Sequence, residues 1–203
     1  MNLLQGTLSE SMVEQLSNQV GGADKEKTAA AASGIIATLT GALAKNAQTT
    51  EGAASLNNAL ERDHDGSILN DVIGMLSNQQ SQGANSSMLN GAGILKHVLG
   101  NQQGGAVEMI SKMSGLDSGK TGSLMTMLAP VIMGALGKTK RDQGLDMAGI
   151  ASLLSGTVSE EKQKNPTMNL ITSFLDKNND GSIVDDVARM GMDMFSNFLK
   201  RKR

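Results

Sequence analysis

Residues 34–45 read Gly-Ile-Ile-Ala-Thr-Leu-Thr-Gly-Ala-Leu-Ala-Lys, and residues 127–138 read Met-Leu-Ala-Pro-Val-Ile-Met-Gly-Ala-Leu-Gly-Lys. In each stretch the final lysine is the only charged residue, so a helix formed there is apolar on much of its circumference. Such a helix is typical of the buried centre of a helical protein. We therefore expect two central helices, with a kink or a helix start at Pro130 in the second.

The composition of the whole chain also favours helices. The 203 residues include 14 Met and 3 Phe but no Trp or Tyr, whereas strands are rich in aromatic and β-branched residues. Only two prolines are present, which is compatible with long helices because an interior proline costs about 3 kcal/mol. We therefore predict an all-α multi-helix bundle.

Charge, cysteine content and hydropathy narrow the class of protein. The net charge of −2 gives no electrostatic reason to expect nucleic-acid binding, and zero cysteines exclude disulfides and thiolate metal sites. No run approaches the roughly 18 apolar residues of a membrane span, and the segment Met1–Gln5 lacks the features of a signal peptide. We expect a cytoplasmic protein without a transmembrane segment; a periplasmic protein without cysteine would have the same composition.

An internal repeat organises the chain, since six short stretches recur in the same order. The pairs are Val13–Ser17 with Val107–Ser111, Gly21 with Gly115, Lys27–Thr28 with Lys120–Thr121, Gly41–Lys45 with Gly134–Lys138, Ala54–Leu56 with Ala151–Leu153, and Asp65–Ile68 with Asp180–Ile183. We therefore predict two helical units, residues 1–100 and 101–203, packed as one body. The second unit lacks an equivalent of the helix expected at Ile94–Leu99 and would share it with the first.

Each unit is expected to contain the same helical series. The first helix presents an apolar stripe, and the next helix begins at an aspartate cap, Asp24 or Asp117. The stripe residues are Val13, Leu16 and Val20 in the first unit and Val107, Ile110 and Met113 in the second. The polar stretch Ser77–Ser87 is expected to be a loop, and Ser155–Thr167 a loop or a short exposed helix.

Four stretches carry a resemblance to a known family: Asp63–Asp71, Gly93–Gly100, Ser114–Asp117 and Met127–Gly137. With these stretches the chain resembles the YidB-like family of bacterial proteins, a domain family of unknown function. The resemblance covers roughly residues 25–140. It implies an all-helical fold and a bacterial source, and it carries over no catalytic residue.

The best candidate site for chemistry is an Asp-Gly loop in the second unit. Residues 176–183 fit the first eight positions of an EF-hand-like calcium loop, with oxygen ligands at positions 1, 3, 5 and 7 and Gly181 at the sharp turn. Position 12, normally a bidentate Glu, is Val187. The predicted ligands of a weak calcium site are Asp176, Asn178, Asp180, Ser182 and Asp186.

The equivalent loop of the first unit fits the calcium pattern less well. Glu61, Asp63 and Asp65 occupy positions 1, 3 and 5, and Asp71 precedes Val72 at position 12. Both loops also have a reading without metal. The Asp-Gly pair then makes a tight turn, the following serine caps a helix, and the later aspartate interacts with the helix dipole.

The remaining motifs do not predict an enzyme. Ser114–Thr121 ends like a phosphate-binding loop but follows a helix rather than a strand, and His64 and His97 are expected to have structural roles. The leading hypothesis is a non-catalytic structural or interaction protein that assembles with itself or with another protein. The Met-rich segment Met190–Leu199 would pack as core or bind a partner. The basic Lys200–Arg203 would favour a helix C-terminus, with contact to a membrane surface as the alternative.

Overall fold

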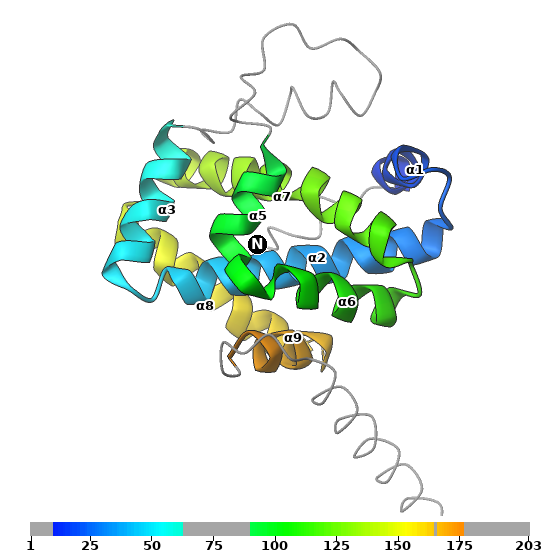
Figure 1. The fold of residues 1–203 in the computed structure, drawn as a ribbon. Coiled ribbons are helices and arrows are strands. Elements are labelled where there is room, and N and C mark those ends of the chain that lie inside the picture. The colour runs from blue at the N-terminus through cyan, green and yellow to red at the C-terminus, as the bar shows by residue number, and fades with distance from the viewer. Residues whose placement is uncertain (1–9, 63–89, 165, 177–203) are drawn as a thin grey trace, which may run out of the picture.

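The computed structural model describes residues 10–62, 90–164 and 166–176, and every regular element within these ranges is helical (Figure 1). The elements are α1 (Glu10–Gln19), α2 (Lys25–Asn46), α3 (Thr50–Arg62), α5 (Gly91–Leu99), the short 3-10 helix η1 (Gly100–Gln102), α6 (Gln103–Ser114), α7 (Ser118–Gln143), α8 (Met147–Lys164) and α9 (Pro166–Asp176). The prediction of an all-α fold is confirmed.

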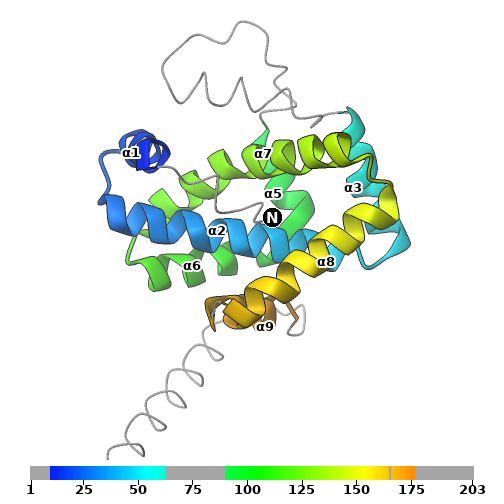
Figure 2. The ribbon, with the colours of Figure 1, turned by 180° about the vertical axis from the view of Figure 1, so that it is seen from behind.

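Helix α2 lies at the centre of the molecule and contacts α1, α3, α5, α6, α7, α8 and α9. In Figure 1 it runs between α7 and α6, and Figure 2 shows α8 and α9 covering it from the other side. Its Ala31, Ala32 and Ile35 side chains are fully buried, as are Leu124 and Met125 of α7. The prediction of two central helices is therefore confirmed. Helix α2 contacts helices from both predicted units, those before residue 100 and those after it. The division of the chain into two repeated units stays a prediction.

The central position of α2 accounts for its unusual composition. Among the described residues, α2 is the one helix long and apolar enough to cross a membrane, which the sequence analysis did not expect. However, 72% of its most apolar window is buried inside the protein. Contact with the surrounding helices therefore explains the apolar surface of α2.

Two aspartates begin the central helices, as predicted. The carboxylate of Asp24 accepts a hydrogen bond from the backbone N–H of Lys27, and that of Asp117 accepts one from Lys120, both at 2.9 Å. Each side chain thus satisfies one of the free N–H groups at a helix start. The segment Ser114–Thr121 is consequently a helix end followed by a capped helix start. Its resemblance to a phosphate-binding loop has no structural counterpart.

One expectation about helix surfaces is wrong, and one pair of alternatives is decided by the structure. Met113 was placed on an apolar stripe, but it is 43% exposed, and Met109 is buried instead. Met113 lies in the last turn of α6, just before the left-handed Gly115 ends the helix. Of the two alternatives for Ser155–Thr167, the loop is wrong and an exposed helix is confirmed, because α8 continues to Lys164 and α9 begins at Pro166. An ion pair between Lys164 and Glu160 stabilises this exposed end.

Pro130 lies buried inside α7, so of the two predicted alternatives the helix start is wrong, while the kink stays a prediction. Because proline has no N–H, the carbonyl of Thr126 four residues earlier lacks its usual helical donor. The first residue of α5, Gly91, lies against this carbonyl. A Cβ atom at Gly91 would be only 1.9 Å from the Thr126 oxygen. The break in hydrogen bonding in α7 therefore gives α5 a place to dock, which only glycine can occupy.

We predict that Gly91→Ala destabilises the fold by about 1–3 kcal/mol, because the added methyl forces α5 away from α7. Urea denaturation of the full-length protein measures the free energy of unfolding. The control is Gly104→Ala in α6, where a Cβ would meet nothing within 4 Å. This control should be neutral or stabilising by up to about 1 kcal/mol. Equal effects of the two substitutions would contradict the docking of α5 through Gly91.

Candidate functional site

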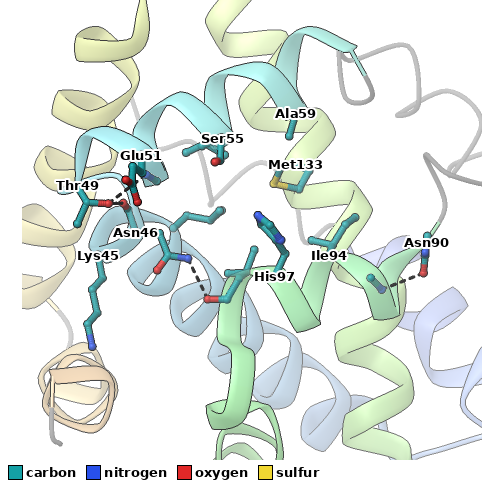
Figure 3. Close-up of a pocket in the computed structure, with 15 residues that line it drawn as sticks. Lys45, Asn46, Thr49, Glu51, Ser55, Ala59, Asn90, Ile94, His97 and Met133 are labelled. Carbon is teal, nitrogen blue, oxygen red and sulfur yellow. Dashed lines mark hydrogen bonds between the residues drawn. The ribbon is translucent and has the colours of Figure 1, made fainter. Parts of the chain in front are cut away.

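A cleft of about 660 Å³ lies between α3 and α5, over the C-terminal end of α2 and the middle of α7 (Figure 3). Its apolar lining is contributed by Leu43, Leu56, Ala59, Ile94, Val98 and Met133, and its polar lining by Lys45, Asn46, Thr49, Glu51, Ser55, Asn90 and His97. Both wall helices pack on α2 and α7. The cleft is therefore built on the most buried part of the fold.

Local backbone contacts set the position of each wall. Helix α3 begins after Thr49, whose hydroxyl accepts a hydrogen bond from the N–H of Gly52 at 3.1 Å. A Cβ at Gly52 would lie 2.0 Å from the carbonyl oxygen of Asn46, so the start of α3 rests directly on the end of α2. Helix α5 begins after Asn90, which accepts from Gly93 at 2.9 Å. Both walls are thus fixed at their first turn.

The end of α2 connects the cleft to α5 and to α9. The Asn46 side-chain amide donates to the carbonyl of Val98 at 3.1 Å, and Figure 3 shows this bond at the base of α5. The ammonium group of Lys45 donates to the carbonyl of Leu175, in the last turn of α9. A cation at this position stabilises the C-terminal end of a helix. The end of α9 therefore lies beside the C-terminal end of α2.

Three polar side chains in the cleft remain available to a ligand. Glu51, Ser55 and His97 are exposed, and within the described residues none of them has a hydrogen bond or ion pair. In Figure 3 the imidazole of His97 projects from α5 into the space beside α3. No hydrogen bond joins these three groups, so the described part of the cleft contains no coupled nucleophile and base. A ligand in this cleft would therefore contact mainly apolar side chains, with the carboxylate of Glu51 at the edge.

Most residues of the predicted calcium sites lie outside the described residues. These are Asn178, Asp180, Ser182 and Asp186 of the second loop and Asp63, Asp65 and Asp71 of the first. The same holds for His64, Ser77–Ser87, Met190–Leu199 and Lys200–Arg203. Within the described ranges, no group of three His, Cys, Asp or Glu side chains is arranged to hold a metal.

The two first positions of the predicted loops are described by the structure. Asp176 is the last residue of α9, so the helix ends where the loop was predicted to begin. Glu61 lies in the last turn of α3 and forms an ion pair with Lys140 of α7 at 2.8 Å. The Lys140 side chain is only 14% exposed. Glu61 also accepts a hydrogen bond from Asn57 at 3.2 Å. Glu61 is therefore used to hold α3 against α7, which weakens the case for it as a metal ligand.

The fold and the cleft define an all-α protein with an open groove between two of its surface helices. The chain belongs to the family described as bacterial protein of unknown function (DUF937), whose sequence model matches residues 2–139. This result confirms the resemblance found in the sequence. No curated protein and no solved structure matches the chain.

The cleft was not predicted from the sequence. Of its lining residues, His97 was considered as a functional candidate, and a structural role was expected for it. One signal was present in α5, where Leu95 and Leu99 form a buried stripe while Ile94 and Val98 form a second, half-buried one. A single docking face needs only the first stripe. The second stripe indicates an additional apolar surface, and in the structure it lines the cleft.

The Lys140–Glu61 ion pair generates a pH-dependent prediction. The pKa of Glu61 is lowered by the hydrogen bonds from Lys140 and Asn57 and by the charge of Lys140. A carboxyl group with a lowered pKa in the folded state adds stability above its ordinary pKa, and this stability is lost as the pH falls through the folded value. We predict that Lys140→Met raises the pKa of Glu61, as measured by carboxyl NMR titration between about pH 5 and pH 3.

The matched control for this titration is Lys138→Met, two residues away on α7. Lys138 pairs with Asp142 at 2.6 Å rather than with Glu61, so this variant should leave the titration of Glu61 unchanged. If the Glu61 titration does not respond to Lys140→Met, the ion pair does not persist in solution.

Proposed function

We propose that this chain is a non-catalytic interaction protein that binds an amphipathic helix of a partner protein in the cleft between α3 and α5. The cleft supports this proposal most strongly, because α3 and α5 form its two walls and apolar side chains form its base. Binding of a helix in such a groove is a common mode of peptide recognition, with apolar side chains of the ligand inserted into the floor. Self-assembly is the case in which the partner is a second copy of the chain.

The polar groups of the cleft favour a helix over a small molecule. Small-molecule sites use several polar groups that converge on one point. Here Asn46, Asn90 and Thr49 bind backbone groups of the protein itself. The available Glu51 and His97 stand on opposite walls. This arrangement supports an extended apolar contact with polar contacts along its edges.

The charges at the rim define the chemistry of the partner. The Lys45 ammonium is directed to the end of α9, whereas the carboxylate of Glu51 is exposed and without a partner among the described residues. A ligand helix with a Lys or Arg beside its apolar face would therefore complement the cleft. We expect such a pair at the exposed rim to contribute about 0.2–1 kcal/mol, less than the apolar contact.

We predict that a fluorescein-labelled peptide of residues 187–203, which combines apolar and basic residues, binds the full-length protein saturably in fluorescence anisotropy. Ser55→Trp, which fills the cleft from α3, should weaken binding at least about tenfold, or about 1.4 kcal/mol. Glu51→Lys should weaken it about two- to fivefold. The control is Ser159→Trp on the exposed face of α8. If the two tryptophan variants bind the peptide equally, the peptide does not use the cleft.

A weak calcium-binding module is the second candidate function, and one observation favours it. Helix α9 ends at Asp176, the residue predicted to occupy position 1 of the second loop. In helix–loop–helix calcium sites the first ligand stands at the end of the entering helix. The ligands beyond Asp176 lie outside the described residues, so support for this function comes mainly from the sequence pattern.

Calcium titration by calorimetry on chelator-stripped protein tests the second candidate. Binding with a Kd of roughly 10⁻⁴ M or tighter is expected, and Asp180→Ala should abolish it because the variant removes the ligand at position 5. The control is Asp146→Ala, which removes the cap of α8 at 2.8 Å from the N–H of Gly149 and leaves the loop intact. Absence of heat up to millimolar calcium would leave the loop as a helix connection.

A further inference from the structure

The cleft has a candidate ligand in the same chain, because α9 ends beside the C-terminal end of α2, which forms part of the cleft lining. Lys45 lines the cleft and donates a hydrogen bond to the carbonyl of Leu175 in the last turn of α9. Leu175 also packs against α2, since a Cβ at Gly41 would lie 2.9 Å from its Cδ1 atom. The described part of the chain therefore ends next to the last turns of α2, of which Leu43, Lys45 and Asn46 line the cleft. Residues 177–203 follow this point.

The sequence of the C-terminal segment complements the cleft. Met194, Phe195, Phe198 and Leu199 have the i, i+1, i+4, i+5 spacing of one apolar helix face. The basic residues Lys200–Arg203 follow directly. Apolar side chains match the cleft floor, and the basic end matches the exposed carboxylate of Glu51. The segment thus has the chemistry derived above for the ligand of the cleft.

The connecting chain is long enough for this contact. Residues 177–189 separate the end of α9 from Met190, and at roughly 3.3 Å per residue they can span up to about 43 Å. For comparison, helix α9 is about 16 Å long at 1.5 Å per residue, so the connecting residues can span more than the length of this helix. A ligand on a short tether has an effective concentration on the order of 1 mM, which favours contact within one chain over contact between chains in dilute solution.

We infer that the segment Met190–Arg203 occupies the cleft of its own chain and competes with partner helices for it. This inference rests on the proposed function, because it takes the cleft to be a helix-binding groove. Only the free cleft can bind a partner, so the segment lowers the apparent affinity for that partner by a factor of one plus the ratio of the occupied to the free state. For a segment with an intrinsic Kd of about 100 µM and an effective concentration of about 1 mM, this factor is about 11.

The test compares binding of the labelled 187–203 peptide to two full-length variants. Phe195→Asp with Phe198→Asp removes the apolar face of the protein's own segment. The matched control, Ser196→Asp with Asn197→Asp, adds the same charge and keeps both phenylalanines. The expected result is about tenfold tighter peptide binding to the Phe variant than to the wild type. The control variant should match the wild type. Adding Ser55→Trp to the Phe variant should weaken peptide binding again.

Three other results would overturn the inference. Equal affinity of wild type and Phe variant shows a cleft that binds helices but is not occupied by its own segment. Absence of binding to both proteins overturns the inference alone, because a partner helix of different sequence can still bind the cleft. A mass that rises with wild-type concentration in light scattering, but not in the Phe variant, shows that the segment binds a second copy instead.

Discussion

Helix α2 is enclosed by α1, α3, α5, α6, α7, α8 and α9, and this burial determines where every other described helix can lie. Large apolar residues such as Ile35 and Leu39 are removed from water, and each contributes about 1.5–3 kcal/mol when fully buried. Small residues let neighbours approach closely. A Cβ at Gly34 would lie 3.4 Å from Ile110 of α6. Because α2 combines large buried side chains with small residues that permit close approach, the surrounding helices can all pack against it.

The cleft follows from the way in which α3 and α5 attach to this core. Each wall helix contacts α2 and α7, and each has in its first turn a glycine that lies against a backbone carbonyl. For α5 this carbonyl belongs to Thr126, which lacks its helical donor because of Pro130. Since both first turns are fixed by backbone contacts, the two walls keep their positions although a cleft lies between them in the described part of the chain. The open groove is thus a consequence of how the core is built.

Those parts of the fold that depend on local interactions could be predicted from the sequence. The helical class, the caps at Asp24 and Asp117 and the central helices needed only propensity, spacing and polarity. The burial of Met113 was predicted wrongly, and the sequence leaves the end of α8 open between a loop and an exposed helix, because both depend on where helices end. The cleft could not be predicted, since it arises from contacts between Gly52 and Asn46 and between Gly91 and Thr126. Such close approaches leave no periodic signal in a sequence.

Isotope-filtered NOE spectroscopy, with methyl-labelled methionines in the full-length protein and an unlabelled peptide of residues 187–203, tests most directly whether the cleft is a helix-binding groove. Met133 lines the cleft, whereas Met113 and Met147 are exposed on α6 and α8. A helix in the groove predicts NOEs between the peptide phenylalanine rings and the methyl group of Met133, with none to Met113 or Met147. NOEs to Met113 or Met147 without any to Met133 would contradict the groove as the binding site.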